Sequence, residues 1–187
     1  MIFFYTMRTF EAQGMTFEET LTPEMIQKEV ARVAGEINRD FAGKEPLFIC
    51  VLNGAFIFAA DLFRKITLHA DITFVRLKSY TGMGASGEVR EIVNLYEDIR
   101  GRDVIVIEDI VDTGNSMHYF KKELFEAGAE SVEVCSFLFK PEALQREDAR
   151  PKYVGFEIPK QYILGYGLDL DEFERNRDAV YTLKTEN

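Results

Sequence analysis

The stretch that decides the fold runs from Val104 to Met117 and reads VIVIEDIVDTGNSM. It begins with an apolar run rich in β-branched residues, which is typical of a buried strand in a parallel sheet. Two adjacent acids follow, then an acidic residue before a glycine turn, and then a segment with helical character. The stretch predicts a strand, a loop and a helix start, with Glu108 and Asp109 where the strand opens into a ligand crevice.

The side chains of this loop suit a phosphorylated sugar. The carboxylates of Glu108 and Asp109 only accept hydrogen bonds, so they suit ribose hydroxyls better than a phosphate. The turn from Thr113 to Ser116 offers small side chains, a glycine and free N–H groups at a helix start, which suit a phosphate. Together they predict a ribose 5-phosphate site. The alternative is a buried strand that simply ends in a solvated turn.

The whole stretch resembles the signature of type I phosphoribosyltransferases, and most closely that of the hypoxanthine and hypoxanthine-guanine enzymes. The matching residues are Glu108, Asp109, Asp112, Thr113, Gly114 and Ser116. The resemblance implies that the two acids hold the ribose hydroxyls of 5-phosphoribosyl-1-pyrophosphate. It also implies that Asp112 is the catalytic residue near the purine, and that Asp112, Thr113, Gly114, Asn115 and Ser116 hold the 5'-phosphate.

Length and composition set the broad class of the protein. The 187 residues suit one domain with a substantial core, and the net charge of -10 is opposite to that of most nucleic-acid or membrane-surface proteins. Cys50 and Cys135 lie in separate apolar runs, which indicates buried thiols rather than a disulfide or a metal cluster. With no apolar run of transmembrane length and no basic segment at the start, we expect a cytoplasmic protein.

Periodicity places further elements on both sides of the central stretch. Apolar residues at helical spacing after Thr22-Pro23 predict a helix over residues 23–41. Apolar runs predict strands over 47–52, 72–77 and 132–139, and a helix over 56–65. This alternation predicts an α/β fold with a doubly wound, mainly parallel sheet flanked by helices. We expect residues 1–187 to form a single domain, in which the N-terminal region and the segment after Lys140 form a small purine-binding hood.

The strand over 47–52 leads into Asn53-Gly54-Ala55, which on its own is only a turn. In the family that the chain resembles, the loop at this point holds pyrophosphate through backbone N–H groups, often with a cis peptide. The resemblance therefore assigns Asn53 and Gly54 to pyrophosphate binding, and it adds Arg175 from near the C-terminus. The sequence does not show whether the Leu52–Asn53 peptide is cis.

Residues 78–87 read KSYTGMGASG and contain a literal G-x-G-x-x-G pattern after a strand. A dinucleotide-binding fingerprint needs a helix at the third glycine, whereas residues 88–95 alternate like a strand. We therefore expect a mobile flap between two strands. Family members have a Ser-Tyr pair here that closes over the reaction centre, which implies the same role for Ser79 and Tyr80.

Lys140 follows the strand over 132–139 and precedes a proline, as in bacterial relatives where such a lysine contacts the 6-oxo group of the purine. Arg150 and Lys152 are alternative cations for that role. The segment 154–169 resembles the family's purine hood. This resemblance implies that Tyr162 stacks on the base and that the backbone of Ile163 reads the base edge.

The same resemblance places Asp169 beside the purine as a metal-contacting residue. The implied cofactor is Mg²⁺, with Glu108 and Asp109 as additional ligands. As a hard ion, magnesium takes oxygen ligands and keeps several waters, so few protein ligands are needed.

The resemblance implies purine salvage, in which 5-phosphoribosyl passes from its pyrophosphate donor to hypoxanthine, giving IMP and pyrophosphate. Guanine, giving GMP, is the second candidate base. The alternatives are a transferase for xanthine or another oxopurine, and an RNA-binding regulator with the same fold. We expect small-molecule substrates, no nucleic-acid or membrane partner, and a homodimer or homotetramer.

Overall fold

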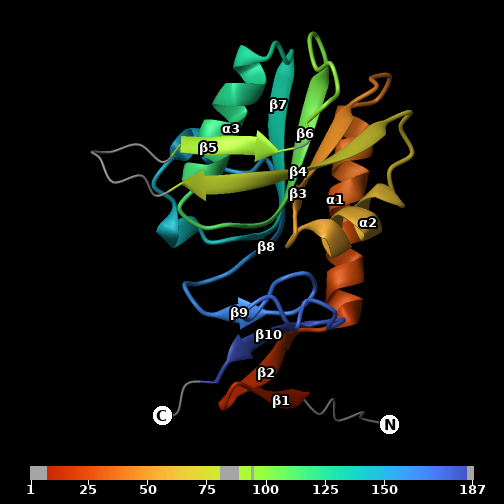
Figure 1. The fold of residues 1–187 in the computed structure, drawn as a ribbon. Helices are drawn as coiled ribbons and strands as arrows, with labels where there is room; N and C mark the ends of the chain where they lie inside the picture. The colour runs from red at the N-terminus through yellow and green to blue at the C-terminus, as the bar shows by residue number, and fades with distance from the viewer. Residues whose placement is uncertain (1–7, 81–88, 94, 185–187) are drawn as a thin grey trace.

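The computed structural model describes residues 8–80, 89–93 and 95–184 (Figure 1). Its larger sheet has six strands in the order β5-β4-β3-β6-β7-β8. Their bounds are β3 Leu47–Leu52, β4 Asp71–Tyr80, β5 Val89–Val93, β6 Asp103–Val111, β7 Ser131–Phe139 and β8 Tyr153–Glu157. All neighbours pair in parallel except β5, which is an antiparallel edge strand. The predicted mainly parallel sheet is confirmed.

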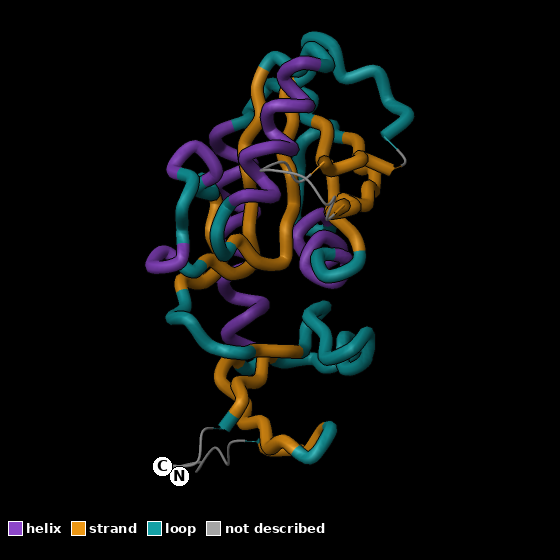
Figure 2. Tube along the Cα trace, turned by 60° about the vertical axis from the view of Figure 1, so that its left-hand side comes forward, coloured by secondary structure: helices purple, strands orange, loops and turns teal. Residues whose placement is uncertain are grey.

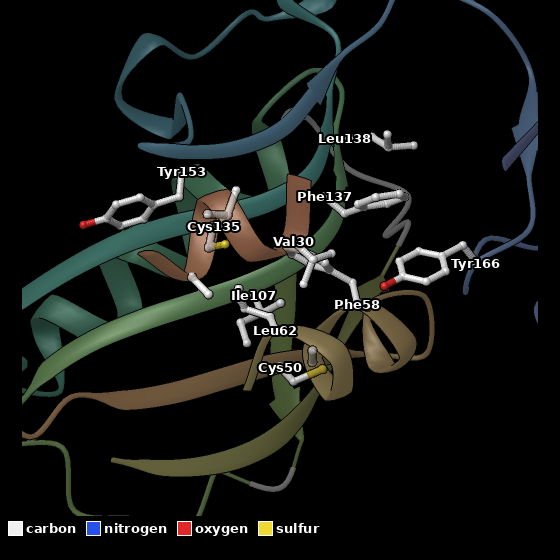
Figure 3. Packing of buried hydrophobic residues seen from close by; sticks show 14 of the residues in the cluster. Val30, Cys50, Phe58, Leu62, Ile107, Cys135, Phe137, Leu138, Tyr153 and Tyr166 are labelled. Carbon is white, nitrogen blue, oxygen red and sulfur yellow. The ribbon is translucent and has the colours of Figure 1, made fainter. Parts of the chain in front are cut away.

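Helices cover both faces of this sheet, as the doubly wound prediction requires. Helices α1 (Pro23–Asp40) and α2 (Phe56–Phe63) lie on one side, and α3 (Asn115–Glu126) lies on the other (Figure 1). Side chains of β6 alternate between the two cores: Ile105 and Ile107 pack with α1 and α2, whereas Val104 and Val106 pack with α3. Figure 3 shows the first of these cores, in which both cysteines are buried and free.

Helix α1 begins where the sequence predicts it, because Thr22 caps it and Pro23 has the right φ for a first helical residue. The Thr22 hydroxyl accepts a hydrogen bond from the Met25 N–H at 3.3 Å. The apolar stripe from Ile26 to Ile37 is fully buried against the sheet and α2. Within the described ranges, no helix is long and apolar enough to cross a membrane.

A second, smaller sheet lies beyond one end of the larger one (Figures 1 and 2). Its strands β1 (Thr9–Ala12), β2 (Met15–Leu21), β9 (Ile163–Leu164) and β10 (Val180–Leu183) follow the antiparallel order β1-β2-β10-β9. Of these, β9 lies nearest to the larger sheet. We call residues 8–21 and 158–184 the hood.

The hood begins later in the chain than the sequence prediction placed it. The segment after Lys140 first forms two short 3-10 helices, Pro141–Ala143 and Glu147–Ala149, and then returns as β8 to pair with β7. Tyr153 at the start of β8 is almost fully buried in the main core. Residues 141–157 therefore belong to the larger sheet and its cover, because their apolar side chains complete that core.

Candidate active site

The predicted site residues gather at the edge of the larger sheet where the parallel strands end. Asn53 follows β3, Asp112 follows β6 and Lys140 follows β7. The N–H of Lys140 donates to the Val111 carbonyl at 2.9 Å, so the ends of β6 and β7 stay joined up to this edge. This is the edge at which open α/β sheets bind ligands.

The carboxylate of Asp109 lies directly against the backbone of Gly54. A Cβ atom added to Gly54 would come within 1.5 Å of the Asp109 Oδ2, so only glycine fits at this position. Burial raises the pKa of Asp109 to about 6; the nearby Asp169 adds to the rise, and Arg175 opposes it. The predicted ribose-binding acid of β6, the loop after β3 that is predicted to bind pyrophosphate, and the hood thus meet at the Asp109 carboxylate.

Glu108 turns to a different set of neighbours. It lines a small pocket of about 100 Å³ with residues of the loop that follows β6 and of the first turn of α3. The other lining residues are Ile110, Val111, Asp112, Thr113, Gly114, Ser116 and Met117. Gly114 lies at the N-cap of α3 and has no side chain with which to cap it, so the first N–H groups of the helix border the pocket. Such a helix start favours an anion.

The segment after Lys140 braces this phosphate-type loop from outside. The Gln145 N–H donates to the Thr113 carbonyl at 2.9 Å, and Arg146 Nε donates to the Asn115 Oδ1 at 3.2 Å. These two hydrogen bonds hold the two sides of the loop against the 3-10 turns. The brace is a structural support that the sequence reading did not include.

Lys140 lies beside Asp112. Its ammonium donates to the Asp112 Oδ2 at 3.3 Å, with the lysine side chain 13% exposed and the aspartate 48% exposed. Arg150 instead pairs with Glu147 at 2.5 Å, and Lys152 pairs with Glu133 at 3.3 Å. Of the three cations considered for the purine, Lys140 is the one held at the carboxyl edge beside the predicted catalytic residue.

The loop after β3 is held on two sides. The Leu52–Asn53 peptide is cis, and Arg76 on β4 donates to the Asn53 Oδ1 at 2.7 Å. From the hood, Gly167 packs so closely on this loop that a Cβ on it would lie 2.0 Å from the Gly54 carbonyl oxygen. The hood therefore touches the core at the loop predicted to bind pyrophosphate.

Asp169 and Arg175 form an ion pair in the hood turn that carries Gly167. Arg175 Nη2 lies 2.8 Å from the Asp169 Oδ1, and Arg175 Nη1 donates to the Gly167 carbonyl at 2.9 Å. The arginine side chain is only 18% exposed. The pair thus places a cation and a carboxylate next to Asp109 and the Gly54 loop.

Tyr162 and Ile163 lie at the end of the hood that faces the larger sheet. Tyr162 is 46% exposed, with its ring 6.3 Å from that of Phe17. The Tyr162 carbonyl accepts from the Leu183 N–H on β10. Backbone groups alternate in direction along a strand, so those of Ile163 point to the open side of β9, the last strand of its sheet. The structure thus leaves a backbone edge for a ligand beside an exposed ring.

The predicted flap falls mainly outside the described residues. Ser79 and Tyr80 end β4, whose last residue pairs in register with Val89 of β5. The described strands β4 and β5 match the two strands expected on either side of the flap. The glycine-rich tip, residues 81–88, lies outside the described ranges.

Residues 19–171 match the family model of the phosphoribosyl transferase domain. The chain belongs to the phosphoribosyltransferase family. It is 38% identical over 164 residues to the hypoxanthine-guanine phosphoribosyltransferase of Streptococcus thermophilus, which covers 87% of this chain and 91% of that protein. The corresponding protein of Aquifex aeolicus is 35% identical over 176 residues, covering 93% and 98%.

Solved structures agree with this assignment. A hypoxanthine-guanine phosphoribosyltransferase from Bacillus anthracis superposes with a TM-score of 0.80 at 33% identity, covering 96% of this chain and 100% of that one. A hypoxanthine phosphoribosyltransferase from Staphylococcus aureus gives a TM-score of 0.83 at 33% identity, with 89% and 91% covered. The phosphoribosyltransferase fold predicted from the sequence is thereby confirmed.

Sequence reasoning missed several residues that support the site of this phosphoribosyltransferase. Arg76 is the charged residue in the run 72–77 (ITFVRL), whose other members are apolar or threonine, and that contrast is the signal that would have marked it. The brace by Gln145 and Arg146 leaves no comparable signal, because a polar loop residue is ordinary. The same holds for Tyr166, which donates to Asp61 of α2 at 2.7 Å across the junction between hood and core.

Proposed function

We propose that this phosphoribosyltransferase transfers the 5-phosphoribosyl group from 5-phosphoribosyl-1-pyrophosphate to N9 of hypoxanthine or guanine, releasing pyrophosphate, in cytoplasmic purine salvage. The observation that carries the proposal is the contact of Asp109 with Gly54 and of Gly54 with Gly167. It joins a ribose-type acid, a pyrophosphate-type loop and the hood in one site. The choice of hypoxanthine or guanine as the base follows the names of the relatives, which are hypoxanthine-guanine and hypoxanthine phosphoribosyltransferases. Those names give the RNA-binding alternative no support.

The donor would lie along the carboxyl edge. Its 5'-phosphate would occupy the pocket at the start of α3, where residues 112–116 supply N–H and hydroxyl groups. Glu108 and Asp109 would accept hydrogen bonds from the ribose hydroxyls. Its pyrophosphate would meet the backbone of Asn53 and Gly54 and the guanidinium of Arg175, which suits phosphate oxygens. Positive charge that develops on the ribose as the bond to pyrophosphate loosens would be stabilised by the two carboxylates.

The purine would lie between the hood and the edge of the sheet. Tyr162 would stack on the base, and the outward backbone groups of Ile163 would hydrogen-bond its edge. Lys140 would donate to the 6-oxo group, and Asp112 would accept or supply the proton at N7. The ion pair of Lys140 with Asp112 supports this pairing, because the 6-oxo oxygen and N7 are neighbours on one edge of a purine and could meet two side chains that lie side by side.

The donor set at the edge fits magnesium. Asp169 and Asp109 offer hard carboxylate oxygens close to the Gly54 loop. Among the described residues, no cluster of three or more metal-binding side chains occurs, which suits an ion that takes most of its ligands from the donor and from water. We propose that Asp169 would hold Mg²⁺ with Asp109 beside it, and that Glu108, the residue before Asp109 on β6, would be the further ligand. The ion would supply charge neutralisation on the pyrophosphate.

Initial rates with five bases would test the base assignment. With donor and magnesium present, we expect turnover with hypoxanthine and guanine, and at most slow turnover with xanthine, adenine and uracil. Guanine differs from hypoxanthine at its 2-amino group, which backbone carbonyls would read, so side-chain identities say little about their ratio. A preference for xanthine would move the assignment to another oxopurine. Salt-dependent RNA binding without turnover on any base would refute the enzymatic proposal.

We also propose that the enzyme is a homodimer or homotetramer. Phe56 at the start of α2 and Phe74 on β4 are 43% and 44% exposed, and large exposed rings on structured elements support self-association. Light scattering coupled to size exclusion would measure the mass. A monomer at micromolar concentration would contradict this part of the proposal.

A further inference from the structure

The carboxylate of Asp61 on α2 accepts hydrogen bonds from three side chains. Its Oδ2 accepts from the Tyr166 hydroxyl at 2.7 Å and from Gln27 Nε2 at 2.5 Å, and its Oδ1 pairs with Arg64. The Asp61 side chain is only 13% exposed. Burial and the bond to Asp61 hold the pKa of Tyr166 above its ordinary value, so the hydroxyl keeps its proton and donates it.

The donors come from the two places where the chain passes between hood and core. Gln27 lies near the start of α1, which directly follows hood strand β2. Tyr166 lies just after hood strand β9, and its ring packs 4.8 Å from that of Phe137 in the core. In Figure 3, the Tyr166 side chain extends from the hood and its hydroxyl oxygen points toward α2. The Asp61 carboxylate on the core thus accepts hydrogen bonds at both places where the chain passes between hood and core.

Asp61 is also linked to the predicted pyrophosphate loop. Helix α2 begins at Phe56, immediately after the loop that contains Gly54. Gly167, the residue after Tyr166, packs on the Gly54 carbonyl, and its own carbonyl accepts from Arg175. A shift of Tyr166 away from Asp61 therefore moves Gly167 and Arg175 away from the Gly54 loop.

We propose that Asp61 is a positioning residue that fixes the hood where Arg175 and the Gly54 loop together hold the pyrophosphate end of the donor. The inference rests on the proposed function, since it assigns pyrophosphate to that loop. It concerns placement rather than contact, because Asp61 lies behind the loop on α2. Placement errors of about 1 Å at a binding site are enough to cost two orders of magnitude in rate.

Tyr166→Phe is the sharpest test, because it removes only the donor hydroxyl and keeps the ring packing. Calorimetric titration with magnesium present would measure binding of inorganic pyrophosphate and of ribose 5-phosphate. We expect pyrophosphate affinity to fall about tenfold, as for loss of a hydrogen bond to a charged group, and the KM for the donor to rise in parallel. Ribose 5-phosphate, which does not need the hood, should bind as in the wild type.

The chain offers a matched control in Tyr153. Its hydroxyl donates to the Asp40 Oδ2 at 3.1 Å, and its ring is equally buried, but this pair lies at the end of α1 away from the hood. Tyr153→Phe should lower the melting temperature about as much as Tyr166→Phe while leaving pyrophosphate affinity unchanged. A purely structural role of Asp61 would give the two variants the same binding profile.

Substitutions at Asp61 itself separate geometry from charge. Asp61→Asn can keep its amide oxygen toward Tyr166 and Gln27 and loses only the ion pair with Arg64, whose side chain is 75% exposed and can turn into solvent, so we expect near-normal pyrophosphate binding. Asp61→Ala should lower pyrophosphate affinity at least as much as Tyr166→Phe, because it also removes the acceptor of Gln27. The double variant should be no weaker than Asp61→Ala alone, since the Tyr166 hydroxyl then has no carboxylate left to lose.

Two outcomes would overturn the inference, and they are distinguishable from each other. Unchanged pyrophosphate affinity in Tyr166→Phe and Asp61→Ala, with an active wild type, would refute the positioning role alone. A wild type that binds neither pyrophosphate nor ribose 5-phosphate would refute the proposed function and this inference with it.

Discussion

The loop after β6 and the turn of the hood are assembled in different ways. The loop is one continuous stretch, residues 108–116, and its proposed binding groups are backbone N–H groups and short side chains near the start of α3. The hood turn depends on distant partners: Gly167 on Gly54, and Tyr166 on Asp61. Local sequence therefore fixes the first region and tertiary packing fixes the second. Changes in the loop should affect the chemical step, whereas changes at the hood junction should affect placement of the donor.

Asp112→Ala should have the largest effect on turnover, and it tests whether the loop after β6 takes part in the chemical step. Removing a proton-transfer group lowers turnover by about two to four orders of magnitude. Because the backbone of the 5'-phosphate pocket stays intact, donor affinity should change little. Single-turnover rates and donor titration would separate the two effects. Near-normal turnover would exclude Asp112 from the mechanism.

Gly54→Ala tests the point where the two regions meet. The new Cβ would lie 1.5 Å from the Asp109 Oδ2, so the carboxylate or the loop must move. We expect kcat/KM for the donor to fall about 100-fold, the scale of a misplacement of about 1 Å. Gly35→Ala on α1 is the matched control, because nothing lies within 4 Å of its added Cβ and alanine favours a helix. Equal activity of the two variants would show that the contact is dispensable.

Lys140→Ala should weaken the use of oxopurines by about 1.5–3 kcal/mol, the range for a hydrogen bond that involves a charged group. The loss should appear in kcat/KM for the purine, with the donor KM nearly unchanged. Lys152→Ala is the control with the same loss of charge, at a residue that pairs with Glu133. If Lys140→Ala has normal kinetics, the 6-oxo role passes to Arg150 or Lys152.

The smallest expected effect is a change of folding stability with pH, and it comes from Asp109. Burial raises its folded pKa from 3.8 to about 6, so the folded state holds this proton more tightly than the unfolded state does. The resulting stability is present below pH 4 and is lost as the pH rises through 6. Asp109→Asn lacks the titration, so the wild type should lose on the order of 2 kcal/mol relative to the variant between these values.

Urea unfolding of both proteins at pH 4 to 7 without magnesium would measure this difference. The difference in unfolding free energy between the two proteins cancels the contributions of other carboxylates, such as Asp98 and Asp148, whose pKa values are lowered by ion pairs. A constant gap between wild type and variant across the range would show that Asp109 is not desolvated.

The loop after β6 could be predicted because its apolar run, acids and glycine turn are consecutive in the chain. Lys140 could be placed near it because neighbouring parallel strands end at one edge. The sequence could not choose between Lys140 and the alternatives Arg150 and Lys152, since the choice depends on their partners Glu147 and Glu133. Those partners depend on how the turns after β7 pack.

The hood was harder to predict, for a physical reason. Tyr166 and Asp61 are 105 residues apart, and no periodicity marks their contact. Strand β9 has only two residues, and β8 carries an apolar pattern that would fit either sheet, so the hood boundary was placed too early. Contacts that bring distant segments together leave little trace in the order of residues.

The order of strands in the hood also has a consequence for how the protein is made. β10, at residues 180–183, lies between β2 and β9, which pair with it and not with each other. A chain leaving the ribosome has completed all strands of the larger sheet before β10 exists, and domains fold as units from the N-terminus during synthesis. The nascent protein should therefore have formed the pocket proposed to bind the 5'-phosphate while the hood still lacks one of its two inner strands. Of the described strands, β10 is the last to be synthesised, and its pairing completes the hood sheet.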